Sequence, residues 1–164
     1  MKKMKLFGIM VLLFSSIFLA GCSLKDENKV TIQTYLENEF TGPTEELRTI
    51  LDQGLYSPEL DVYLEDKYGD ILADLDSMVR RNFVLVFLRD AHVNGYQLQP
   101  QSINIKKIEG TDNNVYDYEV LVVYNKGEET KTAIVSGKIN LDDKGKITMI
   151  RKMDGLELFE ELRN

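Results

Sequence analysis

The chain has 164 residues and a formal net charge of −7, from 27 acidic and 20 basic side chains. This length is enough for one domain with a hydrophobic core of its own. The negative charge and the scattered basic residues argue against a nucleic-acid partner, because phosphates are bound by clustered lysine and arginine. The single cysteine, Cys22, excludes a disulfide within the chain.

The first 21 residues have the layout of a secretory signal. Three lysines open the segment, and an apolar run, Leu6–Ala20, follows. A helix of about 15 residues spans about 22 Å, less than the roughly 30 Å hydrocarbon core of a bilayer. We therefore expect residues 1–21 to be a signal peptide that is removed, rather than a transmembrane helix.

Leu19, Ala20, Gly21 and Cys22 end this segment. The tetrapeptide resembles the lipobox of bacterial lipoproteins. The resemblance implies cleavage before Cys22 and a diacylglyceryl group on its thiol, whose two acyl chains, such as palmitate, suffice for stable anchoring. It implies no other cofactor and places the protein on the extracytoplasmic face of the cell membrane. The mature chain would lose three lysines and carry a net charge of −10.

Residues 22–29 are short and polar, and we interpret them as a lipidated tether before a single domain, residues 30–164. Apolar spacing predicts a first helix over about Asn28–Glu39, with Val30 on its buried face. Pro43 is expected in the first turn of a second helix that ends at Gly54. The dipeptide Ser57-Pro58 predicts the cap and first turn of a third helix, which runs to about residue 68.

A fourth helical pattern contains Ile71, Leu75 and Met78. The next segment, Asn82–Leu88, has two interpretations. Its β-branched and aromatic residues indicate a strand, whereas apolar spacing that continues the preceding pattern indicates a buried helix. We favour the helix, with its end at Asn94-Gly95.

The second half of the chain predicts strands. They cover Gln97–Ile108, Val115–Tyr124, Thr130–Leu141 and the neighbourhood of Ile147–Ile150. In the second of these, Tyr116, Tyr118 and Tyr124 share one face with two valines. Gly145 is expected in the left-handed position of the last hairpin loop. Residues 154–157 resemble a capping box, with Asp154 as the cap, that opens a short C-terminal helix.

Helices first and strands last indicate an α+β domain, with N-terminal helices packed on a curved four-stranded antiparallel sheet and a short C-terminal helix. The element order and the stretches "YLENEFTGPTEEL" and "KITMIRKMDG" are similar to the NTF2-like (cystatin-like) superfamily. They also resemble small secreted lipoproteins of Gram-positive bacteria that carry such a domain. Most members have a strand or hairpin between the helices, and here only Asn82–Leu88 is a candidate for it.

The resemblance implies a conical pocket between helices and sheet, used by some members for catalysis and by others for ligand binding or dimerisation. An enzyme would need an acid–base group there. The candidates for a pocket or binding face are Arg89, Asp90, His92, Tyr96, Tyr116, Tyr118 and Tyr124. The alternatives are a surface histidine near a helix end and tyrosines that simply pack the sheet.

Several acidic residues between positions 61 and 76 could suggest a calcium site, but they do not follow the EF-hand spacing of calcium loops. We expect no metal site. We expect these acids to lie on solvated helix faces, and they are Asp61, Glu65, Asp66, Asp70, Asp74 and Asp76.

The patterns of Ser–His–Asp catalysis, phosphate loops, dinucleotide-binding glycines and zinc sites are absent from the sequence. We therefore assign no catalytic residue and expect a non-enzymatic module that binds a protein partner or a small ligand. The alternatives are a small enzyme that uses an aspartate or His92 as its base and an accessory subunit of an envelope complex. The sequence does not exclude a homodimer.

Overall fold

Six helices and four strands make up the described part of the chain, residues 26–110 and 114–164 of this computed structural model. The helices are α1 (Glu27–Phe40), α2 (Glu45–Asp52), α3 (Pro58–Tyr68), α4 (Leu75–Arg80), α5 (Val86–Asn94) and α6 (Leu156–Arg163). The strands are β1 (Gln97–Lys107), β2 (Asn114–Lys126), β3 (Glu129–Leu141) and β4 (Ile147–Asp154). The expected α+β class, with its helices, four-stranded antiparallel sheet and C-terminal helix, is confirmed.

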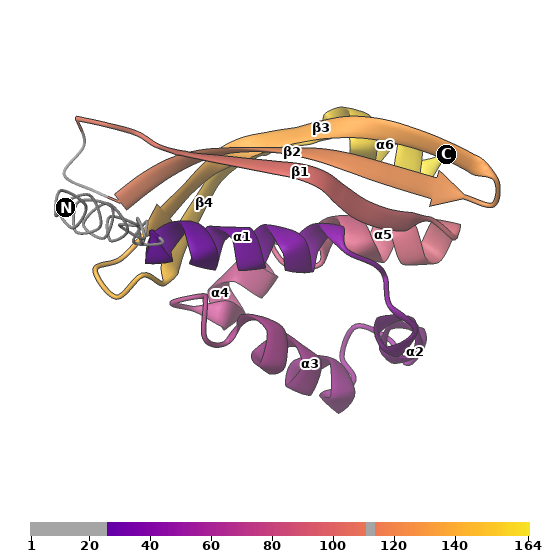
Figure 1. Ribbon diagram of the computed structural model, residues 1–164. Coiled ribbons are helices and arrows are strands. Elements are labelled where there is room, and N and C mark those ends of the chain that lie inside the picture. Colours follow the sequence, from indigo (N-terminus) through magenta and orange to yellow (C-terminus); the bar gives the residue numbers. More distant parts are fainter. Residues whose placement is uncertain (1–25, 111–113) are drawn as a thin grey trace, which may run out of the picture.

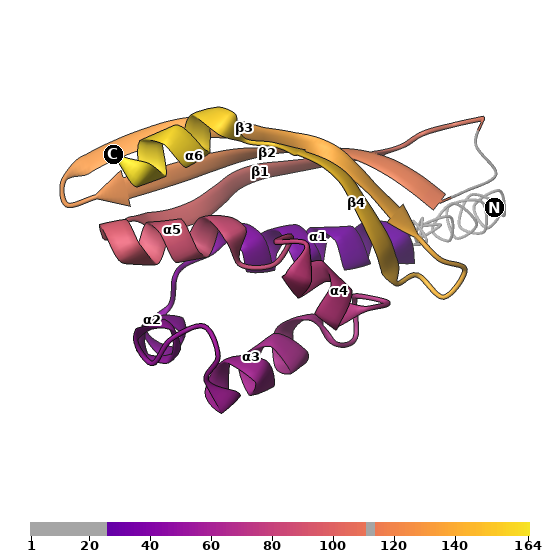
Figure 2. The same cartoon turned by 180° about the vertical axis from the view of Figure 1, so that it is seen from behind.

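The elements lie in three tiers (Figure 1). The sheet arches over α1 and α5, and α2, α3 and α4 form the tier farthest from the sheet. Helix α6 packs against α5 and β3 (Figure 2). Helix α1 begins at one end of the molecule, and α2 lies beyond its other end (Figure 1).

The predicted lipobox, Leu19 to Cys22, and the rest of the predicted signal peptide lie outside the described residues. Helix α1 begins at Glu27, so the last residues of the predicted tether are helical. Within residues 26–110 and 114–164, no helix combines the length and apolar composition that crossing a membrane requires. Val30, expected on the buried face of the first helix, is 46% exposed. That part of the prediction is wrong, because the buried stripe of α1 starts at Ile32.

The sheet is an antiparallel meander with strand order β1-β2-β3-β4. Its inner face was predictable from the alternation in β2, because side chains on a strand alternate between faces. The expected residues are each 3% exposed or less: Tyr116, Tyr118, Val120, Val122 and Tyr124. The hairpin loop before β4 has Gly145 at φ +76°, as expected.

Gly137 allows β3 and β4 to approach each other where the sheet bends. A Cβ at this position would lie 1.9 Å from the carbonyl oxygen of Lys152 and 2.6 Å from the hydroxyl of Tyr118. The register of β3 and β4 shifts directly after it, between Lys138 and Ile139. Such an irregularity bends a strand and increases its twist. Figure 2 shows β4 curving down toward the helices at this side of the sheet.

The second helix does not start at Pro43, as predicted, but at Glu45. The reason is a long-range pairing. The amide of Gly42 donates to the carbonyl of Leu98 at 3.0 Å and its carbonyl accepts from the Leu98 amide at 2.6 Å, which ties the chain to β1 just before the helix. Thr44 then caps the helix through its hydroxyl. The predicted cap of the third helix, Ser57, is confirmed, because its hydroxyl accepts from the Leu60 amide at 3.2 Å.

The segment Asn82–Leu88 is neither one continuous helix nor a strand. Helix α4 ends at Arg80, α5 begins at Val86, and Asn82 and Leu85 between them have φ of +60° and +57°. A left-handed backbone costs a non-glycine residue about 1 kcal/mol or more. Side chains of α1 offset this cost. The hydroxyl of Tyr35 donates to the Phe83 carbonyl at 2.6 Å, and Glu39 accepts from the Leu85 amide at 2.9 Å.

The capping box expected at residues 154–157 does not form. Asp154 is the last residue of β4, and its carboxylate lies 2.8 Å from the ammonium of Lys152. The cap is Gly155, which has no side chain to accept a hydrogen bond. A Cβ there would lie 2.7 Å from the ring of Phe87, so any larger residue would displace that ring. Phe87 in turn stacks on Phe159 of α6, with ring centroids 4.3 Å apart.

We predict that Gly137→Ala lowers the free energy of unfolding by about 3 kcal/mol or more, because the new methyl group collides with backbone of β4. The matched control is Gly127→Ala, whose Cβ meets nothing within 4 Å and whose φ of +63° alone costs about 1 kcal/mol. Urea unfolding of both variants measures the difference. Equal midpoints would contradict a close approach of β3 and β4 at Gly137.

Candidate functional site

A pocket of about 410 Å³ between α2, α5 and the end of α6 brings together three of the predicted candidates. Arg89, Asp90 and His92 all line it. The structure adds Arg163 from α6, which sequence reasoning missed because it lies far along the chain.

Each polar candidate in the pocket is already engaged within the protein. The Nε2 atom of His92 lies 3.0 Å from a carboxylate oxygen of Asp52, and its Nδ1 is buried without a hydrogen-bond partner among the described residues. Arg163 pairs with Asp90 at 2.7 Å. Arg89 donates to the Leu85 carbonyl at 3.3 Å and to the side chain of Asn82. A general base needs a nitrogen that faces the substrate, whereas here Nε2 of His92 faces Asp52 and Nδ1 is buried.

The tyrosine candidates do not join this pocket. The hydroxyl of Tyr116 accepts from Asn28 at 3.2 Å, and that of Tyr118 lies 3.5 Å from the Lys152 carbonyl. Tyr96 and Tyr124 contact each other edge to face, with ring centroids 6.1 Å apart. Because Tyr116, Tyr118 and Tyr124 are buried in the core, their geometry agrees with the alternative of sheet packing.

Glu39 is a buried charged residue that sequence reasoning missed. Its side chain is 0% exposed. One carboxyl oxygen accepts from the Tyr68 hydroxyl at 2.7 Å and from the Leu85 amide at 2.9 Å. Leu85 is the cap residue of α5 and its own side chain cannot accept, so Glu39 caps that helix from a distance, at the positive end of its dipole. The signal was present, because Glu39 continues the buried stripe of α1 at positions 32, 35 and 36.

Burial raises the pKa of Glu39 from 4.5 to about 7, and the hydrogen bonds from Leu85 and Tyr68 and the charge of Arg89 act in the opposite direction. Burial and the nearby Glu39 also raise the pKa of Tyr68 well above its usual value. A carboxyl whose pKa is raised on folding binds its proton more tightly in the folded state. Its contribution to stability is therefore fully present below pH 4.5 and is lost as the pH rises through about 7.

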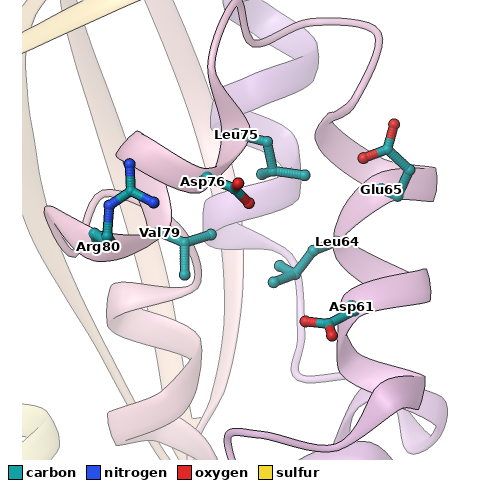
Figure 3. A pocket seen from close by; sticks show the side chains of 7 residues that line it. All are labelled: Asp61, Leu64, Glu65, Leu75, Asp76, Val79 and Arg80. Atoms are coloured by element: carbon teal, nitrogen blue, oxygen red, sulfur yellow. The ribbon is translucent and has the colours of Figure 1, made fainter.

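The acids predicted on solvated helix faces are solvated, but Asp70 and Asp74 lie between α3 and α4 rather than on a helix face. All six are exposed, and Asp74 caps α4 by accepting from the Ser77 amide at 2.8 Å. Figure 3 shows three of them, Asp61, Glu65 and Asp76, around a pocket between α3 and α4 whose centre is apolar. Among the described residues, no group of three or more histidine, cysteine or acidic side chains is placed to hold a metal ion.

A wider groove of about 840 Å³ runs between α2 and α3. Its apolar lining comes from Ile50 of α2 and from Pro58, Val62 and Tyr63 of α3. Large apolar side chains in and beside this groove are strongly exposed. A cluster of exposed apolar side chains often marks an interaction surface. These side chains are Val62 (71%) in the groove and Leu55 (51%) and Tyr56 (99%) in the segment that joins α2 to α3; Val93 (78%) is also exposed but lies on α5, at the other pocket.

We predict that Glu39→Gln removes a pH dependence from folding stability. Relative to the natural protein, the variant should gain about 2 to 3 kcal/mol of unfolding free energy between pH 5 and pH 8, because only the natural protein must then bury a charge. Denaturant unfolding at both pH values measures the change. Glu37→Gln, an exposed position on the same helix, is the control, and a Glu39→Gln profile parallel to the natural one would contradict the buried, proton-binding carboxyl.

Comparison with known proteins adds no identification: no protein-family model, no curated protein and no solved structure matches the chain.

Proposed function

We propose that this chain is a membrane-anchored extracytoplasmic lipoprotein whose single NTF2-like domain binds another protein. The anchoring part is supported by the signal layout and by the lipobox pattern that ends at Cys22. The family part is supported by helices that cover one face of a curved antiparallel meander. The binding part is carried by one observation, the exposed apolar side chains beside the groove between α2 and α3.

The proposed anchor is attached at the end of α1 that lies away from α2 (Figure 1). Asp26, the first described residue, is four residues from Cys22, a distance of at most about 14 Å for an extended chain. Helix α1 therefore starts close to the membrane, and it leads to α2 at the other end of the molecule (Figure 1). The α2 side of the groove therefore lies at the end of the molecule opposite the attachment point (Figure 1).

The geometry favours binding over catalysis. The three polar candidates of the pocket at α5 are held by other groups of the protein, and the strand tyrosines are packed in the core. The second candidate function, a small enzyme with His92 as its base, is favoured by the Asp52 carboxylate that orients the imidazole. A turnover that His92→Ala abolishes without changing thermal unfolding would establish this enzyme in place of a binding module.

We predict that the protein extracted in mild detergent from its own membranes has the mass of residues 22–164 plus a diacylglyceryl group. Cys22→Ser should retain residues 1–21 and lack the lipid, because the modified thiol is absent. Native mass spectrometry measures both masses and also detects a bound protein. A natural chain that keeps its signal would contradict the anchor, and a co-purifying small molecule in place of a protein would favour a ligand-binding pocket.

A further inference from the structure

The groove between α2 and α3 has an apolar lining edged by polar and acidic side chains. Ile50 forms a floor that is only 9% exposed, whereas Val62 on the wall is 71% exposed. Helix α3 has 11 residues and is about 16 Å long, which matches two to three turns of a partner helix. Helices that dock in such grooves place apolar side chains at every third or fourth position.

The rim of the groove is negatively charged. Glu46 and Glu59 line it from opposite helices, and neither forms a salt bridge within the part of the chain that the structure describes. A third acid, Asp66, is paired with its neighbour Lys67 at 2.9 Å. Complementary charge across an interface favours the matching partner and disfavours the wrong one, so these two carboxylates, neither of which is in a salt bridge among the described residues, favour a cationic partner.

Charge is also distributed unevenly over the whole molecule. The helical segment 26–96 has fifteen acidic and six basic side chains, whereas the sheet segment 97–154 has nine of each. The groove lies within this acidic helical segment, between α2 and α3 (Figure 1). A second copy of this chain would bring like charges together at this surface, which disfavours self-association there.

We propose that the groove between α2 and α3 binds a cationic amphipathic helix of a partner protein. Its apolar side chains would lie on Ile50, Val62 and Tyr63, and its lysines or arginines would face Glu46 and Glu59. This inference rests on the proposed binding function and names the surface and the chemistry of the partner.

The test uses the mature lipidated protein in phosphatidylcholine nanodiscs, with empty nanodiscs as the blank. The probe is a fluorescent 14-residue helical peptide of leucine and lysine, and its counterpart has glutamate in place of each lysine. Anisotropy should show saturable binding of the lysine peptide only, weakening with added salt because exposed charges are screened. No binding, or equal binding of both peptides, overturns the inference.

Matched variants locate the binding. Val62→Lys should weaken it at least tenfold, because it removes an apolar contact and adds repulsion. Val93→Lys, at an equally exposed valine outside the groove, should change it less than twofold. Glu46→Gln with Glu59→Gln should flatten the salt dependence, whereas the same change at the exposed Glu157 and Glu160 of α6 should not. Equal effects of the two lysine variants overturn the inference.

The same variants separate this inference from the proposed function. If a partner protein still co-purifies with Val62→Lys in native mass spectrometry, the chain is a binding module that uses another surface. If no partner is found with the natural protein either, the proposed function itself fails.

Discussion

The buried carboxyl of Glu39 joins the helical tiers of this protein. It lies on α1 beneath the sheet, accepts from Tyr68 at the end of α3, and caps α5 through the amide of Leu85. Its neighbour Asn38 donates to the carbonyl of Lys67 at 2.8 Å. Two adjacent residues of α1 therefore hold α3, and with it one wall of the groove, to the body of the domain. A buried acid is costly unless it is hydrogen-bonded, and these bonds make its position specific.

The Glu39 carboxyl also explains the irregular backbone between α4 and α5. Leu85 adopts a left-handed conformation that exposes its amide to Glu39, and Tyr35 fixes the preceding turn through the Phe83 carbonyl. The pocket at α5 is linked to this arrangement, because Arg89 contributes to the electrostatic environment of Glu39. We interpret this region as a structural junction, and the exposed surface of α2 and α3 as the part of the domain that meets other molecules.

The sequence predicted the features that depend on residues close together in the chain. The alternation in β2 identified the buried tyrosines. The Ser57 cap was predictable because a serine directly before a helix that starts with proline can accept a hydrogen bond from a nearby backbone amide. The errors at Pro43 and Asn82–Leu85 share another cause, since in each case a residue distant in sequence decides the backbone. Asp154 differs, because it is the last residue of β4 and its carboxylate lies beside Lys152, two residues away. For the pocket, Arg89, Asp90 and His92 were adjacent on one helix and predictable together. Asp52 and Arg163, which engage them, come from elsewhere in the chain.

The central claim is that a partner protein binds at the acidic groove between α2 and α3. The most direct measurement is photo-crosslinking in living cells, with a photoreactive amino acid placed at position 62 in one strain and at position 93 in another. Our account predicts that position 62 crosslinks to one protein, through a lysine- or arginine-rich amphipathic segment, and that position 93 does not. Crosslinks at position 93 alone, or at position 62 to an acidic segment, would contradict it.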